Sequence, residues 1–227
     1  MLTVSNGGSN YTLQMSGSYT GETFQVSSAT DGSLLVTLCF YPGTRLAAEN
    51  GEIEVQNVTA GTMLRTADGR VMPVRWVGHS EVSMTFADRQ RVLPVRIKAG
   101  ALADGVPARD LLVSPDHAMF LDGILVQAGA LVNGVTIIRE SNVPERFTYY
   151  HVELASHELL LAEGAAAESF VDNVDRMHFH NWDEHEAGGA PIQEMEYPRA
   201  KSARQIPNGL RAQLESRAAT FDYRAIA

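Results

Sequence analysis

The chain has 227 residues, of which 44% are hydrophobic, and it carries a formal charge of −9 at neutral pH. This length allows one core with a small appendage, and the acidic excess disfavours nonspecific binding to nucleic acid or anionic lipid, both of which need a basic face. The sequence shows no stretch near the roughly 20 apolar residues of a membrane span, and its first residues lack the order of a secretory signal. We therefore expect no nucleic-acid partner and no membrane span, and a protein that is either cytoplasmic or exported by a signal-independent route.

Residues 1–38 are rich in Ser, Thr and Gly and predict short strands separated by turns. Alternating stretches occur at residues 11–15 and 23–26. Because this part is too short to form a domain by itself, we treat it as an N-terminal segment.

Residues 39–170 predict an all-β domain made of many short strands. Asp-Gly pairs follow alternating runs at Asp68-Gly69 and Asp122-Gly123, and this combination is typical of β-hairpins. The expected strands lie at residues 52–55, 62–66, 72–77, 111–113, 119–121, 124–126, 136–138, 149–154 and 158–161.

Residues 171–227 form a polar C-terminal extension with one expected helix. Leu210 and Leu214 have the i, i+4 spacing of one face of a helix over residues 209–219, which we expect to pack on the core or on a partner. His178, His180 and His185, with the carboxylates at 183 and 184, could bind Zn or Ni weakly, but a polar tail explains them as well. We assign no metal site and, in the absence of a Gly-rich phosphate loop, no cofactor.

Cys39 is the single cysteine of the chain, so it cannot form an internal disulfide. It lies at the end of a β-like run, before the turn residues Pro42 and Gly43. Two interpretations are open, a nucleophile and a small buried hydrophobe. The residues around His117 and between His151 and His157 could supply the acid and the base that a nucleophilic thiol needs.

Several separate segments, in one order, resemble the bacterial Hint family, which is related to hedgehog autoprocessing domains and inteins. The resemblance covers roughly residues 39–170 and implies a compact, disk-like all-β fold with pseudo-twofold symmetry, and chemistry at the peptide bond between Leu38 and Cys39. The matching segments are residues 39–45, 73–79, 94–101, 109–118, 131–134, 149–154, 162–164 and 167–169.

The chemistry at that bond needs a base, an acid and hydrogen-bond donors, because the Cys39 thiol attacks the Leu38 carbonyl and converts an amide into a thioester. The resemblance implies that His117 polarises the amide and protonates its nitrogen, while Ser114, three residues earlier, fixes the geometry. The alternative is that residues 113–117 form only a turn between strands, with Pro115 at a corner.

Three further histidines are candidates for a role near Cys39. His157 resembles a later histidine that many inteins place near the second reaction step, and it is equally compatible with a structural role. His151 shares a strand face with Glu153, so we interpret it as a surface or structural residue. His79 falls near the position where hedgehog-type domains carry an acidic residue, which makes it a candidate base, although a polar residue in a turn explains it too.

Two departures from the family pattern bear on the activity. Ala60-Gly61-Thr62 stands where family members usually have Gly-Asp, although Thr62 can still cap the turn. Residues 165–170 contain no Asn of the kind that inteins cyclise, and Asn173 lies beyond the Hint-like run. We therefore expect no splicing, but cleavage or transfer of residues 1–38 through a thioester resolved by water, an external thiol or an amine.

Three hypotheses follow. The first is single-turnover autoprocessing, in which the N-terminal segment of the protein is its own substrate. The second is a catalytically inert Hint-fold module with a structural or interaction role. The third is a small cysteine hydrolase that uses Cys39 and His117, which is disfavoured because the resemblance places Cys39 at a self-scission junction.

Overall fold

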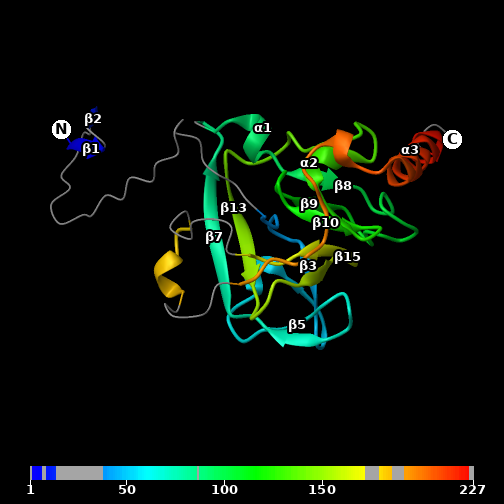
Figure 1. The fold of residues 1–227 in the computed structure, drawn as a ribbon, viewed down its shortest axis with the longest axis horizontal. Coiled ribbons are helices and arrows are strands. Elements are labelled where there is room, and N and C mark those ends of the chain that lie inside the picture. Colours follow the sequence, from blue (N-terminus) through cyan, green and yellow to red (C-terminus); the bar gives the residue numbers. More distant parts are fainter. Residues whose placement is uncertain are drawn as a thin grey trace.

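The computed structural model describes residues 2–6, 9–13, 38–85, 87–171, 179–185 and 192–224 (Figure 1). The strands are β1 (Leu2–Asn6), β2 (Ser9–Leu13), β3 (Arg45–Ala48), β4 (Gly51–Glu54), β5 (Met63–Arg65), β6 (Val71–Pro73), β7 (Trp76–Ser83), β8 (Val95–Ile97), β9 (Leu111–Val113), β10 (Ala118–Leu121), β11 (Ile124–Gln127), β12 (Ile137–Arg139), β13 (Arg146–Glu153), β14 (Leu159–Ala162), β15 (Ala165–Glu168) and β16 (Arg199–Ala200). The helices are α1 (Arg89–Val92), α2 (Ala128–Leu131) and α3 (Asn208–Arg224), with 3-10 turns η1 (Val55–Asn57), η3 (Trp182–Glu184) and η4 (Ala203–Gln205).

Within these residues the strands form four sheets. A nine-stranded sheet runs in the order β16-β11-β10-β15-β14-β3-β5-β6, with β4 paired to β3. A three-stranded sheet has the order β12-β8-β9, and β13 and β7 form a long antiparallel pair. The hairpin of β1 and β2 agrees with the strand expected around residues 11–15, whereas residues 23–26 lie outside the described residues. The all-β class expected from the sequence is confirmed.

Turn chemistry fixes two hairpins of the large sheet. Asp122 and Gly123 have φ angles of 47° and 80° and join β10 to β11 as a two-residue loop. Glu163 and Gly164 have φ angles of 49° and 79° and join β14 to β15 in the same way. Positive φ at both central residues is the signature of the type I′ turn, whose twist matches the flanking strands. The hairpin expected at residues 122–123 is thus confirmed, and Asp68-Gly69 lies in the wider loop between β5 and β6.

Thr62 closes the turn that replaces the Gly-Asp of the family pattern. The Thr59 N–H donates to the Thr62 hydroxyl at 3.0 Å, and the Thr62 N–H donates to the Thr59 carbonyl at 3.0 Å. The expectation that Thr62 caps this turn is confirmed.

One strand expectation needs correction, and one strand was not expected. The run at residues 72–77 is not one strand, because β6 ends at Pro73, which has no N–H to continue a ladder, and β7 begins at Trp76. The alanine-rich β15 gave no strand signal in the sequence, since alanine has low β propensity. It forms because the turn at residues 163–164 folds it back onto β14, where Ala165 and Ala167 are buried.

The main core lies between the nine-stranded and the three-stranded sheets. Its side chains are almost entirely apolar and include Leu46, Leu64 and Leu160 from the large sheet and Val95, Ile97 and Val113 from the small one. Burial of such side chains stabilises a fold by about 1.5–3 kcal/mol each. The core therefore fixes β9, the strand next to which Cys39 lies.

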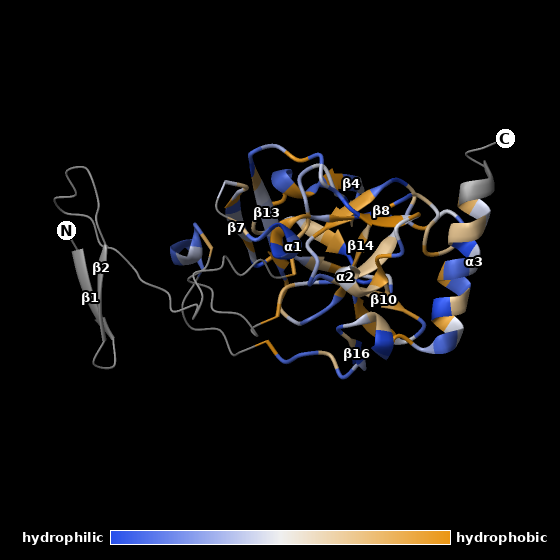
Figure 2. Cartoon of the chain, turned by 90° about the horizontal axis from the view of Figure 1, so that it is seen from above, coloured by the Kyte–Doolittle hydropathy of each residue, from blue (hydrophilic) through white to orange (hydrophobic). Residues whose placement is uncertain are grey.

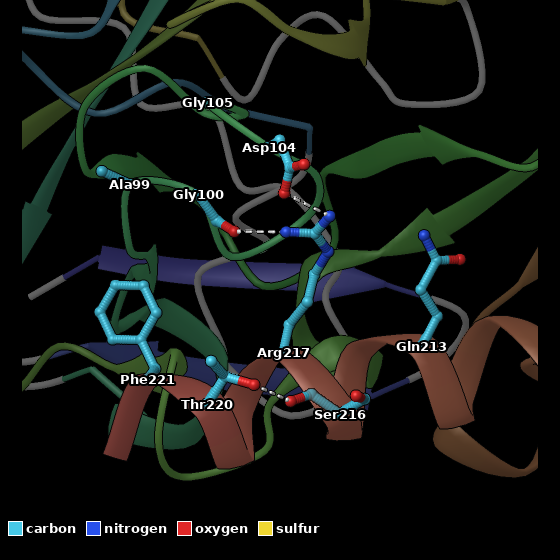
Figure 3. A pocket seen from close by; sticks show the side chains of 9 residues that line it. All are labelled: Ala99, Gly100, Asp104, Gly105, Gln213, Ser216, Arg217, Thr220 and Phe221. Atoms are coloured by element: carbon cyan, nitrogen blue, oxygen red, sulfur yellow. Dashed lines mark hydrogen bonds and ion pairs between the residues drawn. The ribbon is translucent and has the colours of Figure 1, made fainter. Parts of the chain in front are cut away.

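The C-terminal helix packs on this core, as the leucine spacing predicts. Leu210, Leu214 and Ala218 are buried at i, i+4 and i+8, and the two leucines belong to the main core cluster. Figure 2 shows α3 at one end of the body with polar and apolar residues interleaved along it. Arg217 ties the helix to a loop, because its guanidinium pairs with Asp104 at 2.9 Å and donates to the Gly100 carbonyl at 3.4 Å (Figure 3). Of the helices described here, none is long and apolar enough to cross a membrane.

We predict that Leu214→Ala lowers the free energy of unfolding by about 3 kcal/mol, because it leaves a cavity where α3 meets the core. Gln213→Ala, at an exposed position one residue earlier, should change it by less than about 0.5 kcal/mol. Urea unfolding of both variants measures the difference. Equal stability of the two variants would show that the helix contributes little to the core.

Candidate active site

Cys39 is held in the interior by backbone pairing on two sides. Phe40 exchanges hydrogen bonds with Tyr150 of β13, at 2.8 and 3.0 Å, and the Tyr41 N–H donates to the Leu112 carbonyl of β9 at 3.1 Å. The thiol residue is 1% exposed and packs with buried side chains of β7, α1 and β13. The segment that carries Cys39 is therefore wedged between two strands whose positions the core determines.

Leu38, the residue on the other side of the candidate bond, has a backbone conformation that is unusual for its type. Its φ angle is +38°, in the region that favours glycine, and its side chain is buried against Val171 and Ile192. A non-glycine residue in such a conformation costs on the order of 1–3 kcal/mol and persists only where the surroundings impose it. The bond between Leu38 and Cys39 thus joins a strained residue to a fixed one.

Ser114, which directly follows β9, holds the backbone of Cys39 through two hydrogen bonds. The Cys39 N–H donates to the Ser114 Oγ at 2.8 Å, and the Ser114 N–H donates to the Cys39 carbonyl at 2.8 Å. Both residues are buried. Since the Cys39 nitrogen belongs to the amide that joins it to Leu38, the hydroxyl fixes the orientation of that amide.

His151 is in direct contact with the thiol. The Cys39 Sγ lies 2.5 Å from the His151 Nε2. The ring is buried and packs edge-on against Phe170 and Phe179, with centroid distances of 5.7 and 4.5 Å. Burial, with a smaller contribution from the charge of His117, holds the pKa of His151 well below its usual 6.5. The imidazole is therefore neutral at neutral pH, and in the tautomer with its proton on Nδ1 the Nε2 lone pair faces the thiol.

Of the two interpretations of His151, a surface residue or a structural residue, the first is wrong, because the residue is 1% exposed. Alternation places His151 and Glu153 on one face of β13, but both faces are buried at this end of the strand, because residues 151–154 are all buried. Phe179, from the C-terminal extension, covers the His151 side. Gly78 lies opposite His151 in β7, where a Cβ atom would lie 2.4 Å from the Trp76 ring, so the glycine leaves room for this aromatic cover.

His117 is buried near the backbone of the candidate bond. Its ring is fully buried and packs at a tilt of 55° against Phe40, with centroids 4.4 Å apart. Desolvation lowers the pKa of His117 from 6.5 to about 4, although the charge of Glu168 and the nearby backbone of Cys39, Glu168 and Leu38 oppose the shift. Neither ring nitrogen of His117 has a hydrogen-bond partner among the described residues, so the imidazole neighbours the backbone of Leu38 and Cys39 without being hydrogen-bonded to it.

His157 is buried beside Glu168. The Met195 N–H donates to its Nδ1 at 3.1 Å, so the ring proton is on Nε2, which lies 3.4 Å from the Glu168 Oε2. Glu168 also accepts hydrogen bonds from the Ala118 N–H at 3.0 Å and from Arg199 at 2.7 Å. Sequence reasoning gave Glu168 and Arg199 no role, since neither stands at a spacing that points to chemistry.

The structure does not bring His79 to the thiol. His79 pairs with Tyr150, and the neighbouring pair is Gly78 with His151, so the side chains of His79 and His151 lie on opposite faces of the β7–β13 ribbon. The His79 ring lies near that of His180, with centroids 6.2 Å apart.

The histidines of the extension point to different partners. The His185 Nε2 lies 3.1 Å from a Glu153 carboxylate oxygen, whereas His180 lies near His79. Groups of three or more ligands that could hold a metal ion do not occur in the described part of the chain, and His178 lies outside it.

We predict that the buried neutral His117 makes stability depend on pH. A histidine whose pKa is lowered on folding contributes stability that is present above its unfolded pKa of 6.5 and is lost as the pH falls toward about 4. Linkage gives a loss of about 2 kcal/mol between pH 7 and pH 5 from this residue. Between pH 7 and pH 5 the free energy of unfolding of His117→Gln should therefore fall by about 2 kcal/mol less than that of the parent. Urea unfolding at the two pH values measures the difference. The same pH dependence in parent and variant would show that His117 is not buried as a neutral group.

Comparisons with known proteins place these residues in a family. The sequence model of the Hint domain matches residues 38–174. Similar solved structures include the MchDnaB-1 intein, with 16% identity and a TM-score of 0.40 over 58% of this chain and 99% of that one. Another is a bacterial intein-like domain from Clostridium thermocellum, with 13% identity and a TM-score of 0.43 over 60% of this chain and 100% of that one. The comparison with curated proteins gave no match. Because the domain match takes in more than half of the chain, from Leu38 past Glu168, the protein belongs to the Hint domain family.

Proposed function

We propose that the protein processes itself at the bond between Leu38 and Cys39 by an N-to-S acyl shift. The observation that carries the proposal is the contact of the Cys39 thiol with His151 while Ser114 holds the amide N–H of the same residue. A nucleophile next to a base, in a backbone fixed relative to the bond under attack, is the arrangement that covalent catalysis needs.

The first step uses His151 as the base. The Cys39 Sγ attacks the Leu38 carbonyl carbon while the thiol proton passes to the His151 Nε2. A thiol becomes a stronger nucleophile as a neighbouring base takes its proton. The transfer therefore accompanies the attack.

The second step breaks the carbon–nitrogen bond. The Cys39 nitrogen takes up a proton from His117 and leaves as an amine, and the Leu38 acyl group remains on sulfur as a thioester. The low pKa of His117 makes its charged form scarce but strongly acidic, which suits protonation of a poor leaving group. His151 then gives up the thiol proton and His117 is reprotonated through exchange with solvent, so the net result moves one proton from sulfur to nitrogen and leaves both histidines unchanged.

Strain at Leu38 assists both steps. Conversion of an amide into a thioester is unfavourable, and the positive φ of Leu38 raises the free energy of the starting amide by on the order of 1–3 kcal/mol. When the amide is cleaved, this residue is no longer bound to the fixed Cys39 nitrogen.

The thioester is then resolved by water, a thiol or an amine, and residues 1–38 leave or are transferred. Residues 165–170 offer no asparagine for cyclisation, so residues 39–227 remain in one piece. The catalytically inert Hint module is the second candidate. The 1% exposure of Cys39 favours it, because external nucleophiles reach such a buried site poorly.

We predict that hydroxylamine or dithiothreitol at mildly alkaline pH releases residues 1–38, because both attack a thioester far faster than an amide. Intact mass spectrometry should show this fragment together with a single 39–227 portion, and Cys39→Ala should stay intact. An unchanged mass after overnight treatment of the folded parent would favour the inert module instead.

We predict that His151→Gln slows this cleavage by about 10²- to 10⁴-fold, the usual contribution of a positioned general base. His79→Gln changes the same residue type on the paired strand but on the opposite face, and it should cleave within about twofold of the parent. Rates are followed by intact mass after addition of dithiothreitol. If both variants cleaved like the parent, His151 would not be the base; if His79→Gln alone were slow, the base would lie on the other face.

A further inference from the structure

A short strand beyond the Hint domain match reaches into the surroundings of the active site. β16 pairs in parallel with β11, with Arg199 opposite Leu125, and the Leu125 N–H donates to the Pro198 carbonyl at 2.8 Å. This pairing fixes the backbone of Arg199 at the edge of the nine-stranded sheet. Its side chain reaches Glu168 of β15, which its Nη2 contacts at 2.7 Å.

Glu168 is a fully buried carboxylate with a partner on each oxygen. Its Oε1 accepts from the Ala118 N–H at 3.0 Å, and its Oε2 contacts Arg199 at 2.7 Å and the His157 Nε2 at 3.4 Å. A buried charge is retained only when it is paired and hydrogen-bonded. Burial would raise the pKa of Glu168, but the hydrogen bonds from His157 and Arg199, with the charge of His117, lower it below its usual value. Glu168 is therefore an anion at neutral pH.

This anion acts on His117, the residue that directly precedes Ala118. Desolvation disfavours the charged form of the His117 imidazole, and the charge of Glu168 is the largest influence that opposes it. The charged and titratable groups around the pair come from several elements. They are Arg199 of β16 with its ion-pair partner Glu194, His157 before β14, and His151 of β13.

We propose that Arg199 and Glu168 are positioning residues for the reaction at Cys39. Arg199 holds Glu168 as a buried carboxylate against the backbone next to His117, and this carboxylate lets the His117 imidazole take up the proton that it gives to the leaving nitrogen. The proposal rests on the proposed function and extends it. The C-terminal extension, outside residues 38–174, then supplies a residue that the reaction needs.

Two further contacts show that the C-terminal extension packs against residues around the candidate bond. The Met195 N–H donates to His157 Nδ1 at 3.1 Å, and Ile192 packs on Leu38, the residue whose carbonyl is attacked. Residues 192–200 thus contact the acyl side of the bond, the histidine beside Glu168, and Glu168 itself. A segment with these contacts is part of the site and not an appendage.

The first experiment measures cleavage rates with hydroxylamine from mildly acidic to mildly alkaline pH. Glu168→Gln keeps the shape of the side chain and an oxygen for the Ala118 N–H but removes the charge. Because an opposite charge nearby shifts a pKa by about one unit or more, we expect about tenfold fewer His117 rings to carry the proton at a given pH, and about tenfold slower cleavage.

Arg199→Met should produce a similar loss, because the unpaired carboxyl then takes up a proton, and Arg199→Lys should restore most of the rate. Arg204→Met, an exposed arginine of the same extension, is the matched control and should cleave like the parent. The double variant Glu168→Gln/Arg199→Met leaves no buried unpaired charge, so it tests the proposal even if Arg199→Met fails to fold.

The second experiment does not depend on cleavage. In Cys39→Ala, NMR titration of the His117 ring should show a lower pKa in Glu168→Gln and in the double variant, by about one unit, and no change in Arg204→Met. If the parent does not cleave, the proposed function fails while this titration still decides the inference. A titration unchanged by Glu168→Gln would overturn the proposal even if cleavage were slower, because the pair would then act through stability alone.

Discussion

The pairing of the chain at residues 39–41 between β9 and β13 is the constraint on which the site depends. Phe40 bonds to Tyr150 on one side while Tyr41 bonds to Leu112 on the other, so the thiol and the candidate bond have one position relative to both strands. His151 lies next to Tyr150 on β13, and Ser114 follows directly after β9. His151 on β13 and Ser114 directly after β9 therefore contact Cys39, and the core that fixes these strands also fixes the positions of the three residues.

Burial has the same effect on both histidines of this site, but the consequences differ. It keeps His151 neutral, with its lone pair available to the thiol, and it also keeps His117 neutral, which makes a proton donor scarce. A nearby carboxylate is the simplest correction, and Glu168 is placed to supply it. The carboxylate in turn needs a cation, which comes from Arg199. The buried His117 is thus followed by a compensating anion, Glu168, and then by a cation, Arg199, whose side chain is 20% exposed.

The C-terminal extension completes the enclosure of the site from two directions. Phe179 packs on the His151 ring, and residues 192–200 contact Leu38, His157 and Glu168. These contacts lie beyond the part of the chain that the Hint domain match covers. The family fold supplies the strands and Cys39, and the extension supplies Phe179, which helps to bury His151, and Arg199, which pairs with Glu168. Access of any external molecule to Cys39 therefore depends on the position of this extension.

The sequence by itself determined the features that depend on local chemistry. These are the all-β class, the hairpin at Asp122-Gly123, where positive φ is needed at both residues, and the face of α3 marked by Leu210 and Leu214. The order of its motifs also singled out Cys39, Ser114 and His117. Only the tertiary structure decided the place of His151, because strand alternation assumes that one face meets solvent, whereas here an aromatic cover from the extension buries it. The contacts of Cys39 with His151, 112 residues apart, and of Glu168 with Arg199, 31 residues apart, follow from sheet order, which no local pattern encodes.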